Sequence, residues 1–238
     1  MESAAITHRG LVRSNNEDSF LALPEIGLFA VADGMGGHLA GEVASRLALE
    51  ILKNSVRTGR NIDPLSELLT AAKKANRQVY YVAQTSEEYG GMGTTLTTCL
   101  IQESVLYWVH IGDSRGYLVR EGEINQFTQD HSLVSDYVRD GKLTAEEAET
   151  HPYRNVLSRA LGPEPTAMLD SGTISIQKGD IVVLCTDGLT AHLTDKEILE
   201  IVQDGPLTKQ AKQLLELALK RGGRDNVTCV LVRVSGSN

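Results

Sequence analysis

Five aspartates stand where apolar segments begin or end, and their carboxylates are the side chains best placed to do chemistry. They are Asp18, Asp33, Asp113, Asp187 and Asp225. Clustered carboxylates repel one another unless a cation or shared protons compensate. Oxygen ligands without a Cys or His cluster favour Mg²⁺ or Mn²⁺ over zinc. Two such ions about 3.5–4 Å apart activate a water molecule and neutralise a phosphoryl group.

The pairing of strands decides whether these acids meet. Ser19–Leu23 and Leu28–Ala32 are expected strands, and Pro24–Gly27 between them is suited to a hairpin turn. In antiparallel register, such a hairpin places Asp18 and Asp33 side by side at its open end. We therefore expect this pair to share one edge of a sheet.

A second pair of acids depends on strands far apart in the sequence. If Val227–Val234 lies antiparallel near Ile181–Thr186, Asp225 and Asp187 also meet at one sheet edge. The alternative is that each acid only forms a turn, which is the better interpretation of any one of them alone. The turn-forming dipeptides are Asp33-Gly34, Asp187-Gly188 and Asp225-Asn226.

The elements that must position these acids have mixed periodicity. Other short segments rich in β-branched residues are expected strands: Thr94–Ile101, Val105–Ile111 and Gly116–Arg120. The expected helices are Gly41–Val56, Pro64–Gln84, Asp195–Val202 and Leu207–Arg221. Runs of strands separated by short turns favour antiparallel hairpins, and the helices between runs indicate an α+β sandwich.

The composition is that of an ordinary globular protein. The chain has 238 residues, 41% of them hydrophobic, and 23 basic against 31 acidic residues, which gives a net charge of −8. This acidity argues against nucleic-acid binding and a polybasic membrane anchor, and no apolar run approaches a membrane span. Three scattered cysteines and no visible signal peptide predict a cytoplasmic protein. Without a break in composition, residues 1–238 are expected to form a single domain.

Six motifs follow one another along the chain, and together they carry a family resemblance. They are Arg13-Ser14-Asn15-Asn16-Glu17-Asp18, Val31-Ala32-Asp33-Gly34-Met35-Gly36-Gly37-His38, Gly91-Met92-Gly93-Thr94-Thr95, His110-Ile111-Gly112-Asp113-Ser114-Arg115, Cys185-Thr186-Asp187-Gly188-Leu189 and Gly223-Arg224-Asp225-Asn226-Val227-Thr228. With these motifs in this order, the chain resembles the PPM/PP2C family of metal-dependent Ser/Thr protein phosphatases, in particular its compact bacterial members.

The resemblance implies a four-layer αββα sandwich, in which two antiparallel sheets are flanked by helices and a binuclear Mg²⁺ or Mn²⁺ site lies at one edge. It implies that Asp33 bridges the two metals and that Asp187 and Asp225 complete the first metal's ligands. Residues at about 131–160 match the position of the family's flap, a variable element beside the active site.

The resemblance also implies ligands for a second and a third ion. The carbonyl of Gly34 serves the second metal, together with Asp18 or Glu17 acting through water. Bacterial members hold a third, looser ion, for which Asp113 and Asp187 are the corresponding residues here.

Arg13 matches the phosphate-binding arginine of the family, and its planar guanidinium can grip two phosphate oxygens at once. The implied reaction is attack on phosphorus by a metal-bridging hydroxide, in line with the leaving oxygen. Animal-type members carry a histidine directly after the Asp-Gly pair, where this chain has Met35. The proton for the leaving oxygen is therefore assigned either to His38 or to a water on the third metal.

The expected function is hydrolysis of phosphoserine and phosphothreonine in phosphorylated proteins, by a monomeric signalling phosphatase that opposes a kinase. Two alternatives remain at this point. A pseudophosphatase would bind phosphoproteins without turnover, but such proteins usually lack a metal aspartate and all are present here. A phosphoesterase acting on small molecules would use the same groups, and the sequence contains no base-recognition feature.

Overall fold

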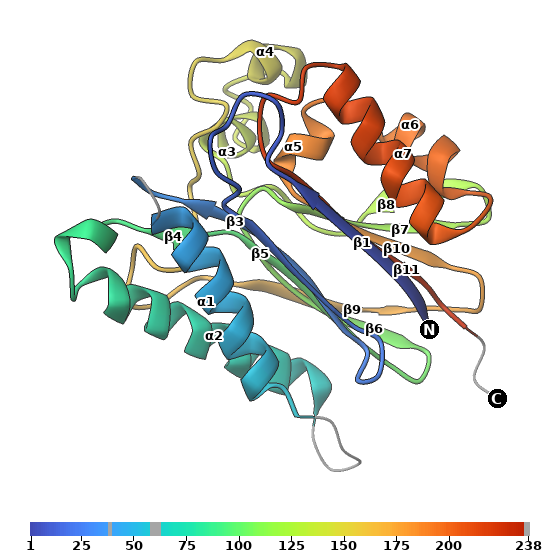
Figure 1. Cartoon of the computed structure of the whole chain (residues 1–238), viewed down its shortest axis with the longest axis horizontal. Helices are drawn as coiled ribbons and strands as arrows, with labels where there is room; N and C mark the ends of the chain where they lie inside the picture. Colours follow the sequence, from blue (N-terminus) through green and yellow to red (C-terminus); the bar gives the residue numbers. More distant parts are fainter. Residues whose placement is uncertain (38–39, 58–62, 236–238) are drawn as a thin grey trace.

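Two antiparallel sheets lie face to face in the computed structural model, which describes residues 1–37, 40–57 and 63–235. One sheet has the strand order β1-β11-β10-β7-β8, and the other has the order β2-β3-β5-β6-β9, with β4 paired to β3. Helices α1 and α2 cover the outer face of the second sheet, and α5, α6 and α7 cover that of the first (Figure 1).

Runs of strands and groups of helices follow one another along the chain. The strands are β1 (Glu2–His8), β2 (Asp18–Leu23), β3 (Leu28–Met35), β4 (Gly93–Thr94), β5 (Leu96–Gln102), β6 (Val105–Ile111), β7 (Arg115–Arg120), β8 (Glu123–Gln126), β9 (Asp170–Ser175), β10 (Ile181–Cys185) and β11 (Val227–Arg233). The helices are α1 (Ala40–Ser55), α2 (Pro64–Ala83), α3 (Leu133–Arg139), α4 (Ala145–Thr150), α5 (Asp187–Thr190), α6 (Asp195–Val202) and α7 (Leu207–Lys220), with a 3₁₀ turn at Glu87–Tyr89.

Three apolar layers hold the sandwich together, one between the sheets and one beneath each set of helices. Strand β3 shows how alternation divides its side chains. Phe29 and Val31 enter the middle layer, whereas Leu28, Ala30 and Ala32 pack under α1 and α2. Strands buried on both faces are almost continuously apolar, as β3 is. The predicted αββα sandwich is confirmed.

Both predicted pairings of acids are confirmed by the strand register. Asp18 lies directly opposite Asp33 in the β2–β3 hairpin. Strands β10 and β11 run antiparallel with Cys185 opposite Cys229, so Asp187 just after β10 and Asp225 just before β11 come to the same end of the sheet. In each pair of strands, the two acids therefore lie at the same end of the sheet.

Three edge or near-edge strands were not predicted from the sequence. Strand β9 alternates fully between partly buried and exposed residues, and β8 has only four residues, three of them exposed. Strand β1 contains four partly buried residues and one buried residue, Ala4, and lies at the edge of its sheet. Such strands bury too little apolar surface to produce a continuous hydrophobic run.

Candidate metal centre

One pocket of about 240 Å³ collects most of the predicted site residues. Its lining includes Arg13, Glu17, Asp33, Gly34, Asp113, Asp187 and Asp225. Asp18 is not among its lining residues. His38 lies outside the described residues, so the structure does not place it.

The acids reach the pocket from the ends of several elements. Asp33 lies in β3, Asp113 in the turn between β6 and β7, Asp187 at the start of α5 and Asp225 before β11. The backbone around Gly34 is crowded, because a Cβ atom there would lie 2.0 Å from the carbonyl oxygen of Gly41. Glycine is therefore required at this position for helix α1 to approach β3.

Burial and mutual repulsion disfavour the charged form of these acids. Burial, reinforced by Asp18 and Asp187, raises the pKa of Asp33 well above the ordinary aspartate range. Burial first and the charge of Asp187 second raise the pKa of Asp113 to about 8. Burial likewise raises the pKa of Asp18 to about 7, although hydrogen bonds from Thr228 and Thr186 oppose the shift.

Two buried oxygens of these aspartates have no hydrogen-bond partner in the described part of the chain. They are Oδ1 of Asp18 and Oδ1 of Asp187. A buried polar atom that lacks a partner is costly, and a cation supplies the missing interaction. Carboxylates and the Gly34 carbonyl form an all-oxygen donor set, which suits Mg²⁺ or Mn²⁺. The residues at this pocket therefore fit hard divalent cations by their chemistry.

Protein donors engage part of the same carboxylates. Arg13 Nη2 donates to Asp225 Oδ2 at 2.7 Å, and Thr186 Oγ1 donates to Asp18 Oδ2 at 2.8 Å. Within residues 1–37, 40–57 and 63–235, no group of three or more His, Cys, Asp or Glu side chains is arranged to hold an ion as it stands. The fit to a cation thus rests on donor chemistry and unpaired buried oxygens, since no cage of ligands is preformed.

Arg13 is the one basic side chain among the residues that line the described pocket. Its hydrogen bond to Asp225 raises the pKa of the guanidinium, which stays positively charged. The side chain is 55% exposed, so it is accessible to a ligand that enters the pocket. A guanidinium above buried carboxylates can bind a phosphate group whose other oxygens contact cations.

The sequence model for protein phosphatase 2C matches residues 8–231 of the chain. The chain belongs to the protein phosphatase 2C family. It is 44% identical to the serine/threonine protein phosphatase PstP of Mycobacterium tuberculosis. The alignment of 234 residues covers 97% of the chain and 44% of PstP. The chain therefore spans less than half the length of that relative. The serine/threonine phosphatase stp of Listeria monocytogenes is 36% identical over 234 residues, which cover 95% of the chain and 93% of that protein.

Solved structures of this family have the same fold. The structure of M. tuberculosis PstP/Ppp superposes with a TM-score of 0.93 at 42% identity, covering 98% of both chains. A structure of the PstP catalytic domain in complex with two manganese ions gives a TM-score of 0.89 at 42% identity, again over 98% of both chains. No helix among the described residues of this protein phosphatase 2C family member is long and apolar enough to cross a bilayer.

Asn226 is a residue of this phosphatase-family site whose role the sequence did not reveal. Its Oδ1 accepts a hydrogen bond from the backbone of Glu17 at 2.8 Å. Its Nδ2 donates to the carbonyl oxygens of Arg9 at 3.0 Å and Asn15 at 2.8 Å. Asn226 thus ties the loop that carries Arg13 to the start of β11. Its one sequence signal was the Asp225-Asn226 pair, which is equally typical of a turn.

Thr95, between β4 and β5, supports the site through its side-chain hydroxyl. Its Oγ1 accepts from the backbone of Asp33 at 2.9 Å and lies 2.7 Å from Ser114 Oγ. This buried pair of hydroxyls links the end of β3 to the turn that carries Asp113. The two acids are therefore positioned relative to each other by hydrogen bonds.

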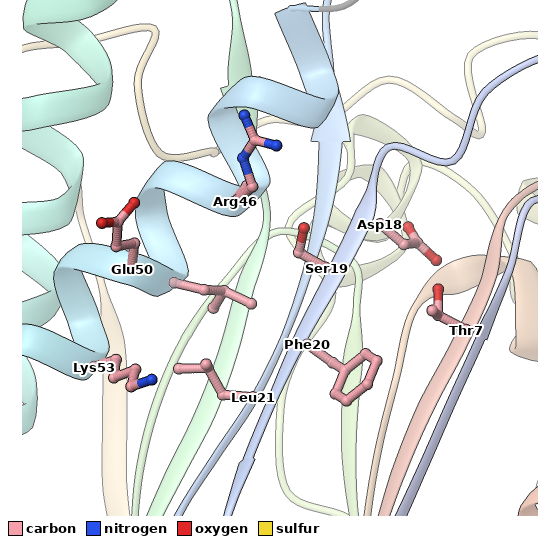
Figure 2. Close-up of a pocket in the computed structure, with 9 residues that line it drawn as sticks. Thr7, Asp18, Ser19, Phe20, Leu21, Arg46, Glu50 and Lys53 are labelled. Carbon is pink, nitrogen blue, oxygen red and sulfur yellow. The ribbon is translucent and has the colours of Figure 1, made fainter.

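A larger groove of about 460 Å³ lies elsewhere on this phosphatase-family fold, between β2 and α1 (Figure 2). Arg46 and Lys53 of α1 line one side, and Phe20 and Leu21 of β2 line the other. Asp18, at the end of the groove, is the one predicted site residue among its described lining residues. Size therefore does not identify the site here, since the groove lacks the convergent acids and the arginine.

Proposed function

We propose that the protein is a metal-dependent protein Ser/Thr phosphatase, which releases phosphate from phosphoserine and phosphothreonine. The observation that carries this proposal is the single pocket in which Arg13 lies beside four aspartates from distant parts of the chain. The names of its relatives support the same activity. The accessible guanidinium supports binding of a phosphate, and the buried acids support binding of cations.

The proposed metal ligands are those that the family resemblance implies, and the positions of the acids support them. Asp33, Asp187 and Asp225 would hold one ion, and Asp33 would also contact the second. Glu17 lines the pocket, whereas Asp18 accepts from Thr186 through Oδ2 and keeps its Oδ1 without a partner, so either acid would serve the second ion. The ions would supply Lewis-acid stabilisation of phosphoryl charge and a water of lowered pKa.

The second ion would also bind the carbonyl of Gly34, and a third would use Asp113 together with Asp187. The close approach of Gly41 to Gly34 supports this role, because the crowded backbone holds the Gly34 peptide in place. The pairing of Thr95 with Ser114 supports a fixed spacing between Asp33 and Asp113.

The protein's own groups would bind and orient the phosphate. Arg13 would grip two phosphate oxygens, and its hydrogen bond to Asp225 would aim the guanidinium across the pocket. Asn226 would hold the loop of Arg13 in place. His38 remains the candidate side chain for giving a proton to the leaving oxygen.

We also propose that Mn²⁺ or Mg²⁺ is the native ion, and that the protein acts as a cytoplasmic monomer on phosphorylated proteins. Cys99, Cys185 and Cys229 are buried free thiols, which suits a reducing compartment. The net charge of −8 supports a partner other than nucleic acid or an anionic membrane surface.

The deciding experiment measures phosphate release from phosphoserine, phosphothreonine and phosphotyrosine peptides with Mn²⁺ or Mg²⁺, and with excess chelator. We expect metal-dependent release from the first two peptides and its loss in Asp187→Ala. Asp204→Ala, at an exposed acid outside the pocket, is the matched control and should keep full activity. Release that persists in chelator or in Asp187→Ala contradicts the proposal. Hydrolysis of a small phosphoester without any phosphopeptide points to a small-molecule phosphoesterase.

A further inference from the structure

His131 is a buried histidine, 1% exposed, at the start of the segment 131–160. It holds Gly112, the residue before Asp113, from two directions. The backbone nitrogen of His131 donates to the Gly112 carbonyl oxygen at 2.7 Å, and the Gly112 nitrogen donates to His131 Nδ1 at 3.1 Å. The turn that carries Asp113 is thus fixed by one residue of another segment.

The far side of the ring is anchored to strand β9. Nε2 of His131 lies 3.0 Å from Asp170 Oδ2, and Arg159 Nη1 donates to Asp170 Oδ1 at 3.1 Å. Because Nδ1 accepts from a backbone N–H, the proton of the neutral ring is on Nε2, which donates to Asp170. Burial lowers the pKa of His131 and so favours this neutral form. Both ring nitrogens therefore have assigned partners.

The same residue closes the base of the segment. Its carbonyl oxygen accepts from the nitrogen of Ser158 at 2.9 Å, and Ser132 and Leu157 form an isolated antiparallel bridge. The two ends of the segment therefore pair with each other beside His131. Leu157 also lines the pocket of the candidate metal centre. His131 thus contacts the pocket-lining segment, β9 and the Asp113 turn at the same time.

His110, a neighbouring buried histidine, provides a comparison for His131. His110 is fully buried, with its ring centre 4.8 Å from that of His131. Its ring nitrogens contact Thr97 Oγ1 and the carbonyl oxygen of Gln129, each at 2.9 Å. Neither contact reaches Gly112 or the pocket-lining end of the segment. His131 differs because two of its three partner segments, the Asp113 turn and the segment end at Leu157, supply residues that line the pocket.

We propose that His131 is a positioning residue, which couples the position of the segment 131–160 to the position of the Asp113 carboxylate. A displacement of the segment that moves His131 also moves Gly112, since the two residues exchange two hydrogen bonds. Binding of a phosphoprotein against the segment and binding of a cation at Asp113 would then influence each other. This inference rests on the proposed function, in which Asp113 holds the third ion.

Two substitutions of His131 separate its contacts. His131→Asn keeps an acceptor near the place of Nδ1 and loses the group that reaches Asp170. His131→Gln keeps a donor near the place of Nε2 and leaves the buried Gly112 N–H without its acceptor, which is the costlier loss. His131→Asn should therefore rescue the position of Asp113 where His131→Gln does not. His151→Gln, in the same segment and in contact with Tyr153 instead, is the matched control.

Mn²⁺ binding is measured by calorimetry on the whole protein. The Asp113-dependent component is the part of the wild-type isotherm that is absent from Asp113→Ala. We expect His131→Gln to weaken that component about tenfold or more, and His131→Asn and His151→Gln to leave it within about threefold. Limited proteolysis at residues 140–155 should speed up in His131→Gln. If that variant does not fold, hydrogen exchange of the wild type carries the test: Mn²⁺ should slow exchange of the Gly112 and Ser158 amides, which His131 contacts.

The inference is overturned if the isotherm of His131→Gln matches that of the wild type, or, in the exchange experiment, if Mn²⁺ leaves the Gly112 and Ser158 amides unchanged. It is equally overturned if His131→Asn weakens Mn²⁺ binding as much as His131→Gln, or if Asp113→Ala removes no component. Phosphopeptide hydrolysis by the wild type is measured separately. A wild type without that activity refutes the proposed phosphatase function, whereas an active wild type with unchanged variants refutes only the role of His131.

Discussion

Replacement of Asn226 by aspartate tests whether this side chain holds the loop of Arg13. The change preserves size and keeps the acceptor for the Glu17 nitrogen, but removes both donors to the carbonyl oxygens of Arg9 and Asn15. Asn226 is 5% exposed, so water cannot readily replace these bonds. Two neutral hydrogen bonds at about 0.5–1.5 kcal/mol each amount to about 2 kcal/mol. A carboxylate facing two carbonyl oxygens adds repulsion in the same direction.

For a protein of this size, about 2 kcal/mol corresponds to a fall in Tm of about 4–8 °C, which calorimetry resolves. Because the loop also carries Arg13, kcat/KM for a phosphopeptide should fall about tenfold, which corresponds to about 1.4 kcal/mol of lost transition-state binding. Asn125→Asp, at an exposed position of β8, is the control and should change the stability by less than about 0.5 kcal/mol. If Asn226→Asp keeps full activity and a Tm within about 1 °C of the wild type, well short of the expected fall, this reasoning is refuted.

Three further predictions concern charge and packing. Arg13→Lys should lower kcat/KM for phosphopeptides about tenfold with little change in Tm, since its ion pair is largely exposed; equal kinetics of the two proteins would contradict a bidentate role. In excess chelator, urea unfolding should show stability falling as the pH rises towards about 8, because the raised pKa values of Asp18 and Asp113 make the folded state bind more protons than the unfolded state; a midpoint that rises over this range would oppose it. Phe29→Ala, between the sheets and fully buried, should cost about 3–5 kcal/mol in urea unfolding, and a loss below about 1 kcal/mol would be inconsistent with the middle layer.

The β2–β3 hairpin shows what local sequence determines. Its two strands are near neighbours in the chain, and the core residues of β3 alternate between two apolar layers. A shift of one residue would turn each side chain to the wrong layer, so the pairing of Asp18 with Asp33 followed from the sequence. The meeting of Asp187 with Asp225 was predicted only on the condition that two distant apolar strands pair antiparallel, and β10 and β11 do.

Contacts between distant residues were not accessible to the same reasoning. The carboxylate of Asp18 turns to Thr186, which lies 168 positions further along the chain, and therefore lies outside the pocket lining. The three partners of Asn226 are all more than 200 positions away. Neither contact leaves a periodic signal, because side-chain direction at the end of a strand depends on which elements pack there.

The pairing of β1 with β11 sets a condition on when the protein can work during its synthesis. Ile6 lies opposite Cys229, and Arg13 meets Asp225 only when both ends of the sheet are in place. A ribosome adds about 5–20 residues per second, so β1 waits about 10–45 seconds for its partner strand. During that interval the nascent chain has neither the arginine–aspartate contact nor a finished edge on this sheet. The proposed phosphatase activity would therefore begin only after β11 has left the ribosome.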